Sequence, residues 1–325
     1  MTLITPKIKS ATVKLKTDRP VQKTPYQVKG VLMKNFPNDE IVPMLNGSYR
    51  KKFLYPRIQV KIVDEEILLV GIHQGVEPIL AIHEKIKDLN FGDITFDVLE
   101  KSIQVSEEAF FFSSSIHKYR FLSNWVALNI NTSKKYDLKK DEDKLQYLNN
   151  LIAKNIVFIA REMGFELPKN IYSKISVSDL NPIKLDQNGW RAFDGEFYSN
   201  IILPDYIGIG NGITRGYGTI NGSHSDDILP FDNKEFEELK LESENSHFSL
   251  DSENFCSTLF EVDISTIQKP NVRKNKKKKS YPSKKKKSFD KVKATRSKKE
   301  KTTKQNSDEP VNYNSYEYHK KQHSI

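Results

Sequence analysis

The stretch RIQVKIVDEEILLVGI at residues 57–72 decides the fold, because it holds two short apolar runs around an acidic centre. Arg57 to Val63 and Ile67 to Ile72 are rich in β-branched residues, so each run favours a strand. Asp64, Glu65 and Glu66 lie between the runs and are typical of a turn. This stretch therefore predicts a β-hairpin.

The segments on either side of the hairpin predict alternating strands and helices. A strand is expected at 11–15 and a helix at 26–35 before it, and a helix at 76–89 and a strand at 93–99 after it. The second helix rests on helical spacing of Val76, Ile79, Leu80, His83 and Ile86. Strand, helix, hairpin, helix, strand is the βαββαβ order of a ferredoxin-like, or RRM-like, unit.

The second half begins with a long amphipathic helix. Residues 141–164 place Leu145, Leu148, Ile152 and Ile156 on one face, and Gly164 is typical of a helix end. Strands are expected at 172–177, 196–203 and 217–220. No internal repeat is visible, so a second ferredoxin-like unit is an inference about architecture, and the fold class is α+β.

Charge divides the chain into three parts. Residues 1–224 carry 30 basic and 25 acidic side chains, residues 225–268 carry 2 and 12, and residues 269–325 carry 20 and 5. We therefore predict an N-terminal domain at 1–110, a C-terminal domain at 111–224, an acidic connector at 225–268 and a Lys-rich tail at 269–325.

The tail lacks apolar periodicity and is expected to be disordered. It holds two runs of four lysines, which are Lys276, Lys277, Lys278, Lys279, Lys284, Lys285, Lys286 and Lys287. Such runs bind phosphate backbones without sequence preference, through counterion release. A solubilising tail and a partner for the acidic connector are the alternatives.

Several classes of protein are excluded by composition. No window reaches the roughly 18 to 20 apolar residues of a membrane span, and MTLITPKIKSATVKLK has no apolar signal region. We expect a cytoplasmic protein. The single cysteine, Cys256, forms no internal disulfide, and the seven histidines lack paired zinc-ligand spacing. No metal and no cofactor are expected.

The sharpest motif is GIGNGITRGYG at residues 208–218. Its glycines, Gly208, Gly210, Gly212, Gly216 and Gly218, permit close backbone approach to a phosphate or to another part of the chain. Within the motif, Arg215 suits a phosphate and Tyr217 suits stacking on a base. The spacing fits neither a Walker A loop nor a Rossmann fingerprint. A tight turn between strands is the structural alternative.

Together with Trp125 to Asn129, Trp190 to Phe197 and Ile202 to Gly208, this motif resembles the glycine-rich loop of RAMP-type CRISPR RNA-processing endoribonucleases, b-type subgroup, over residues 1 to about 220. The resemblance implies two tandem ferredoxin-like domains that bind a CRISPR repeat transcript. It also implies metal-independent cleavage, in which a ribose 2′-OH attacks the adjacent phosphate and leaves a 2′,3′-cyclic phosphate and a 5′-OH.

The resemblance also implies a histidine just before the hairpin, and residues 43–56 contain none. The candidates there are Tyr49, Lys51 and Lys52, with Ser48 nearby. His73 and His83 are interpreted as structural, and His117 as a remote substitute. General acid–base assistance is worth about 10²- to 10⁴-fold, so a slow enzyme or a non-cleaving RNA-binding homologue is expected.

Other possibilities stay open at this point. One is a general nucleic-acid-binding protein that relies on its basic tail. The sequence also leaves undecided whether the chain forms a homodimer and whether it joins other CRISPR effector subunits.

Overall fold

The computed structural model describes residues 7–185, 189–222, 255–257 and 259–267. The Lys-rich tail and most of the acidic connector lie outside these residues. The elements of the first half are, in order, β1 (Ser10–Thr17), α1 (Pro25–Asn35), α2 (Ile41–Leu45), η1 (Ser48–Lys51), β2 (Ile58–Val63), β3 (Glu66–Ile72), η2 (His73–Gly75), α3 (Val76–His83), β4 (Asp88–Asn90) and β5 (Thr95–Ser106).

The first sheet has the strand order β2-β3-β1-β5-β4, and each neighbouring pair is antiparallel. The β2–β3 hairpin predicted from residues 57–72 is present, with Asp64 and Glu65 both at positive φ in its two-residue turn. Thr24 begins α1 in a capping box with Gln27, and Pro25 occupies the first turn, where its missing N–H costs nothing.

The second half continues with β6 (Phe111–Phe121), β7 (Trp125–Leu128), α4 (Ile130–Asp137), α5 (Asp141–Met163), β8 (Asn170–Val177), β9 (Ile183–Lys184), β10 (Arg191–Phe193), β11 (Gly195–Ile202), η3 (Ile213–Arg215) and β12 (Ile220–Gly222). It ends with β13 (Phe255–Cys256), β14 (Phe260–Asp263) and η4 (Ile264–Thr266). Helix α5 begins with three acidic residues and ends at Gly164 in the left-handed region.

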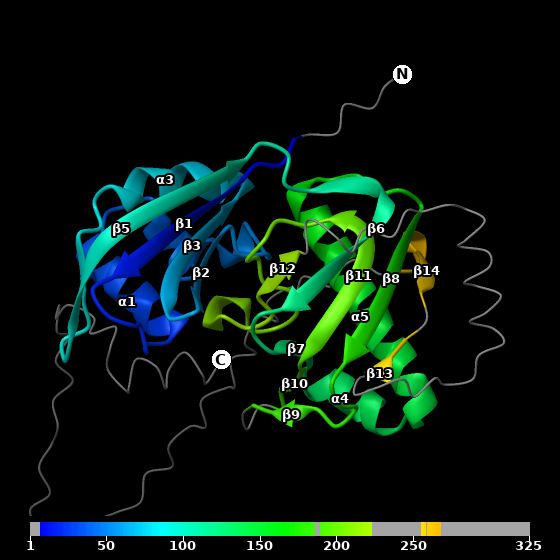
Figure 1. Cartoon of the computed structure of the whole chain (residues 1–325). Coiled ribbons are helices and arrows are strands. Elements are labelled where there is room, and N and C mark those ends of the chain that lie inside the picture. The colour runs from blue at the N-terminus through cyan, green and yellow to red at the C-terminus, as the bar shows by residue number, and fades with distance from the viewer. Residues whose placement is uncertain (1–6, 186–188, 223–254, 258, 268–325) are drawn as a thin grey trace, which may run out of the picture.

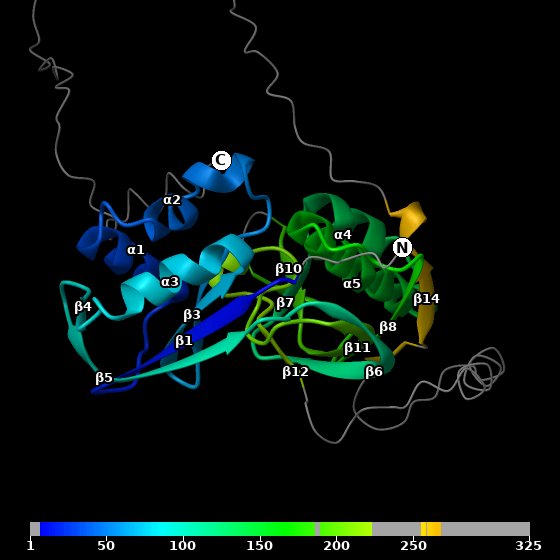
Figure 2. The ribbon, with the colours of Figure 1, turned by 90° about the horizontal axis from the view of Figure 1, so that it is seen from above.

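The second sheet has the order β12-β6-β11-β8, with β13 and β14 both paired to β8. Across the sheet, β12, β6, β11 and β8 occupy the positions that β5, β1, β3 and β2 occupy in the first sheet. Helix α5 links β6 to β8, whereas the glycine-rich segment and η3 link β11 to β12, where the first half has α3. Figures 1 and 2 show helices on one side of the molecule and the main strands of both sheets on the other.

Part of the expected acidic connector belongs to the fold. Residues 260–263 pair with Ser173 to Asn170 of β8 as strand β14, and Phe255 and Cys256 pair with Val177 and Ser176 as β13. Arg161 then donates to the carbonyls of Ile264 and Ile267. Part of the segment predicted as connector, residues 255–267, therefore packs on the second sheet through Phe255 and Val262.

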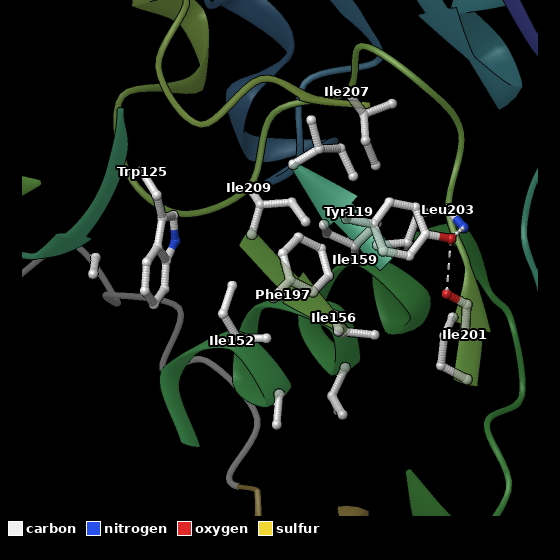
Figure 3. Close-up of a cluster of buried hydrophobic side chains, with 14 of the residues drawn as sticks. Tyr119, Trp125, Ile152, Ile156, Ile159, Phe197, Ile201, Leu203, Ile207 and Ile209 are labelled. Atoms are coloured by element: carbon white, nitrogen blue, oxygen red, sulfur yellow. Dashed lines mark hydrogen bonds between the residues drawn. The ribbon is translucent and has the colours of Figure 1, made fainter. Parts of the chain in front are cut away.

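Two hydrophobic cores hold the structure. The first lies between the first sheet and α1, α2 and α3. The larger second core contains Trp125, Ile152, Ile156 and Phe197, which Figure 3 shows packed between the strands and α5. It also includes first-half residues, namely Ile8, Tyr55, Leu68, Val70 and Ile72, so the two halves share one core.

Two expectations from the sequence differ from the structure. The helix expected at 76–89 ends at His83. Ile86 and Leu89 are still buried in the core, but Ile86 lies after a turn and Leu89 lies in β4. The strand expected at 217–220 begins at Ile220. Among the described residues, no helix is long and apolar enough to cross a membrane.

Candidate functional site

An exposed cluster of cations and aromatic rings follows α2. Gly47, at φ 86°, turns the chain into η1, which carries Tyr49 and Lys51 on its surface. The Lys52 ammonium lies 5.3 Å from the centre of the Tyr49 ring and 5.1 Å from that of Phe53. The two rings meet edge to face at 6.1 Å. Cation–π contacts of this kind orient the lysine without neutralising it.

The second half of the chain anchors this cluster. A carboxylate oxygen of Glu162, at the end of α5, accepts hydrogen bonds from the amides of Leu54 (2.9 Å) and Tyr55 (3.2 Å). The Arg57 side chain donates to the Glu162 carbonyl, and its guanidinium lies 4.8 Å from the Phe53 ring centre. Burial lowers the pKa of Arg57, and nearby Glu162 opposes that shift.

Tyr55 and Gln59 hold the beginning of the glycine-rich segment. The Gly208 amide donates to Gln59 Oε1 at 2.8 Å, and the Tyr55 hydroxyl donates to the Gly208 carbonyl at 2.8 Å. A Cβ at Gly208 would come within 2.6 Å of the Ile213 side chain. At Gly218, with φ 63°, a Cβ would lie 1.9 Å from the Ile209 carbonyl oxygen. Both glycines are therefore required for packing.

The tip of the glycine-rich segment reaches α1. Gly212 and Gly216 flank η3 at φ 73° and 93°, and Gly216 lies against Pro25. The Arg215 guanidinium stacks 4.8 Å from the Trp190 ring centre. The amides of Gly208, Gly216 and Gly218 donate to protein oxygens, so they are not available to hold a phosphate. Side chains rather than these amides must make any ligand contact there.

A fully buried lysine lies beneath this segment. Lys61 is 0% exposed on β2, and its ammonium has no hydrogen-bond partner among the described residues. A Cβ at Gly208 would lie 2.8 Å from its Nζ, so the glycine leaves room for the amine. Burial lowers the pKa of Lys61 from 10.5 to about 7.

A second buried lysine lies on α1. The Lys29 side chain is 8% exposed, and its Nζ lies 4.7 Å from the centre of the Tyr26 ring. Burial lowers the pKa of Lys29 to about 8. An amine that loses its proton near neutral pH can act as a base, whereas an ordinary lysine cannot.

The histidines lie apart from the Tyr49–Lys52 contact. His73, exposed at φ 53°, reaches the cluster only indirectly, because Gln74 accepts from Arg57 and lies 3.5 Å from the His73 ring. Burial and then Arg57 lower the pKa of His73. His83 bonds the Leu80 carbonyl at the end of α3, and His117 bonds the Ser113 hydroxyl at 2.8 Å.

The structure thus brings Tyr49 and Lys52 into contact and places Lys51 on the same exposed turn. Tyr55, six residues after Tyr49, contacts Gly208. Arg215 and Tyr217 lie on the glycine-rich segment, where Arg215 stacks on Trp190. The eight tail lysines lie outside the described residues. Within the ranges that the structure describes, no group of His, Cys, Asp and Glu side chains is arranged to hold a metal ion.

Sequence reasoning missed Lys29, Lys61 and Glu162. For Lys61 a signal existed, since Gln59 and Lys61 alternate with apolar residues in β2 and so share one face of the sheet. That face would have to be solvated or covered, and the shared second core covers it. Neither Lys29 nor Glu162 carries a local pattern that indicates its partners.

Both halves of the chain match known domain families. The sequence matches the model of the Cas6b N-terminal domain over residues 6–109 and that of the Cas6b C-terminal domain over residues 111–223. A solved structure described as Cas6b is 25% identical with a TM-score of 0.53, and the match covers 66% of this chain and 98% of that one.

Two further relatives are similar over part of the chain. A solved structure described as the CRISPR RNA processing endoribonuclease Cas6b is 25% identical, with a TM-score of 0.48 and coverage of 66% of this chain and 99% of that one. An uncharacterized protein of Methanocaldococcus jannaschii is 25% identical over 135 residues, which are 42% of this chain and 92% of the relative.

Proposed function

The chain belongs to the Cas6b family of CRISPR RNA-processing endoribonucleases, and from this premise we propose that it binds a CRISPR repeat RNA and cuts it once per repeat without a metal ion. In this proposal its two halves are tandem ferredoxin-like domains. The ribose 2′-oxygen bonds to phosphorus while the bond from phosphorus to the 5′-oxygen breaks. A base takes the 2′-OH proton, and an acid gives a proton to the leaving oxygen.

The observation that carries the proposal is the exposed Tyr49–Lys52 contact, held at the junction of the two halves. Lys52 keeps its ammonium exposed while the Tyr49 and Phe53 rings fix its direction. A cation placed in this way suits the extra negative charge of a phosphorane. Tyr49 presents a hydroxyl beside it, which suits alignment of the 2′-OH, and Lys51 adds a second positive charge.

Proton transfer is the weaker part of this site. A phenol hydroxyl is a much weaker proton acceptor than an imidazole, so Tyr49 alone is poorly suited to act as the base. The described contacts join no histidine directly to Tyr49 or Lys52, and His73 lies beyond Gln74 and Arg57. A positioned imidazole typically accelerates such a reaction about 10²- to 10⁴-fold. We therefore expect this protein to cleave RNA more slowly than an enzyme with such an imidazole, by up to that factor.

The same observation favours a second candidate, which is a non-cleaving holder of the repeat RNA. It keeps the glycine-rich segment with Arg215 and Tyr217 as the binding surface, and it lacks the chemistry. Tight binding of RNA that stays intact is its expected behaviour.

A third candidate, general nucleic-acid binding by the tail, is tested by truncation. Because Arg161 holds the Ile267 carbonyl, the chain should be cut after 267 and not before β13. If the tail supplies the affinity, its removal weakens binding to every RNA alike and flattens the salt dependence. Specific binding that survives truncation assigns recognition to the body.

The deciding experiment incubates the protein with a labelled repeat RNA from its own source in excess EDTA, followed by native and denaturing gels. We expect a shifted band and one cut, abolished by a 2′-deoxy substitution at that site. Lys52→Ala should then abolish cutting while binding changes little, and Lys34→Ala, which removes an exposed lysine from α1, should leave both unchanged. Unaltered cutting by Lys52→Ala would exclude this lysine from the reaction.

A further inference from the structure

One face of the second sheet is covered and the other is open. Phe197, Ile175 and Ile201 point into the core beneath α5, as Figure 3 shows for Phe197 and Ile201. Residues between them point the opposite way. On that open face no helix of the described ranges packs, and Figure 2 places α4 and α5 on the other side.

Three residues form a row across this open face. Tyr198 of β11 pairs directly with Lys118 of β6 on one side and with Lys174 of β8 on the other. The lysine Nζ atoms lie 5.7 and 5.5 Å from the centre of the Tyr198 ring. Since neighbouring strands are about 4.8 Å apart, the two lysines are rooted about 10 Å from each other.

One carboxylate organises the row. Glu196 forms an ion pair with Lys118 at 3.1 Å and accepts from the Tyr198 hydroxyl at 3.1 Å. Lys174 forms no ion pair with any described residue, and Arg120, which pairs with Glu196 across the strands, is exposed. Three cations thus face one carboxylate on adjoining rows of β6, β11 and β8. Glu261 of β14 pairs with Tyr172 of β8 and is exposed at the far edge of this sheet, so the excess of positive charge is confined to β6, β11 and the neighbouring part of β8.

We propose that this open face binds RNA phosphates, with Lys118 and Lys174 as the contacting groups and Tyr198 as the residue that positions both ammonium groups. The identity of the ligand as RNA rests on the proposed function. The residues lie away from the Tyr49–Lys52 cluster, on different elements, so the face is a second contact surface for the same RNA. Because lysines read charge and not base edges, it adds affinity without adding sequence preference.

The test compares full-length Lys118→Gln/Lys174→Gln with a matched control, Lys135→Gln/Lys154→Gln. The control removes two exposed lysines from α4 and α5 on the helical side. Binding of a labelled single-stranded repeat RNA is measured by fluorescence anisotropy from 0.05 to 0.3 M salt, with thermal melting to show that each variant is folded.

Each single-strand phosphate contact contributes about 0.7 to the slope of log affinity against log salt concentration. Loss of two contacts should lower the slope by about 1.4 and weaken binding about 25-fold at 0.1 M salt. The control should titrate like the wild type. Glu196→Gln should tighten binding, because it removes the carboxylate that competes with phosphate for Lys118.

Two results separate this inference from the proposed function. Suppose that the wild type cuts the repeat RNA, and that the double variant and the control bind with the same salt slope. This result refutes RNA binding by the open face and leaves the proposed cleavage function standing. If the wild type does not cut, yet the double variant alone loses slope and affinity, the open face is supported and the cleavage proposal fails. Tyr198→Ala removes the ring and should weaken binding, whereas Tyr198→Phe keeps the ring and should bind like the wild type; equal binding by both variants would refute positioning by the ring.

Discussion

Replacing Lys61 with methionine should stabilise the protein, although the change removes a lysine from beneath Gly208 and adds no new contact. Lys61 is fully buried, and its ammonium has no hydrogen-bond partner among the described residues. Burial lowers its pKa from 10.5 to about 7, whereas in the unfolded chain the pKa stays near the higher value. Methionine keeps a similar length and apolar stem.

The sign of the effect follows from proton binding. Because the folded pKa is lowered, the unfolded chain binds more protons than the folded chain between about pH 7 and pH 10. The wild type therefore gains stability as pH rises through this window. Taking 1.36 kcal/mol per pKa unit, the amine costs about 4 kcal/mol at pH 7 and about 2 kcal/mol at pH 9.

The assay is urea unfolding of the wild type, Lys61→Met and Lys34→Met at pH 7, 8 and 9. The difference between Lys61→Met and the wild type should shrink by about 2 kcal/mol across this range. Lys34 is exposed on α1, so its replacement should give a difference that does not change with pH. A constant difference for Lys61→Met would refute the argument from burial.

Two further predictions concern Glu162, at the junction of the halves, and Gly218, in the glycine-rich segment. Glu162→Ala removes the carboxylate that accepts from the amides of Leu54 and Tyr55, so it should lower the free energy of unfolding by about 1 to 2 kcal/mol. It should also reduce RNA cleavage more than RNA binding. Equal losses of cleavage and binding would contradict a local role for Glu162. Gly218→Ala should lower the free energy of unfolding by about 3 kcal/mol or more, because its Cβ would meet the Ile209 carbonyl oxygen at 1.9 Å. Gly92→Ala, at φ 95° with open space around it, should lower it by about 1 to 2 kcal/mol. Equal melting temperatures of the two variants would refute the steric argument.

Much of the first half could be predicted from local patterns. The hairpin at 57–72 and the helix beginning at 141 have strong signals, because β-branched runs and a helical apolar stripe act over a few residues. The helix at 25–35 has a weak apolar pattern, and its capping box is seen only in the structure. The end of α3 could not be predicted, because Ile86 and Leu89 continue the helical spacing of apolar residues although they lie after the helix, Leu89 in β4.

Strands β6, β13 and β14 were missed for a different reason. Strand β6 contains His117, Lys118 and Arg120 among its apolar residues, so its polar open face hides the alternation. Strands β13 and β14 are short and sit in acidic surroundings, and only pairing with β8 orders them. Such pairing depends on residues about 80 positions away in the chain.

The candidate site was found in part. Tyr49 and Lys52 were proposed from their place before the hairpin, and the structure brings them into contact. Glu162 and Lys61 depend on contacts between the halves, which no window of sequence reveals. The spacing of the glycines is visible in the sequence, but the partners of Gly208, which are Tyr55 and Gln59, lie about 150 residues earlier.

The core shared by the two halves makes the chain indivisible. A fragment that ends near residue 110 would leave Leu68, Val70 and Ile72 facing water, and burying each such side chain is worth about 1.5 to 3 kcal/mol. The separated halves should therefore aggregate or associate, and the intact body should melt in one calorimetric transition. For the same reason, exchange of halves between relatives requires that the first half's β3 face and the second half's glycine-rich segment be inherited together.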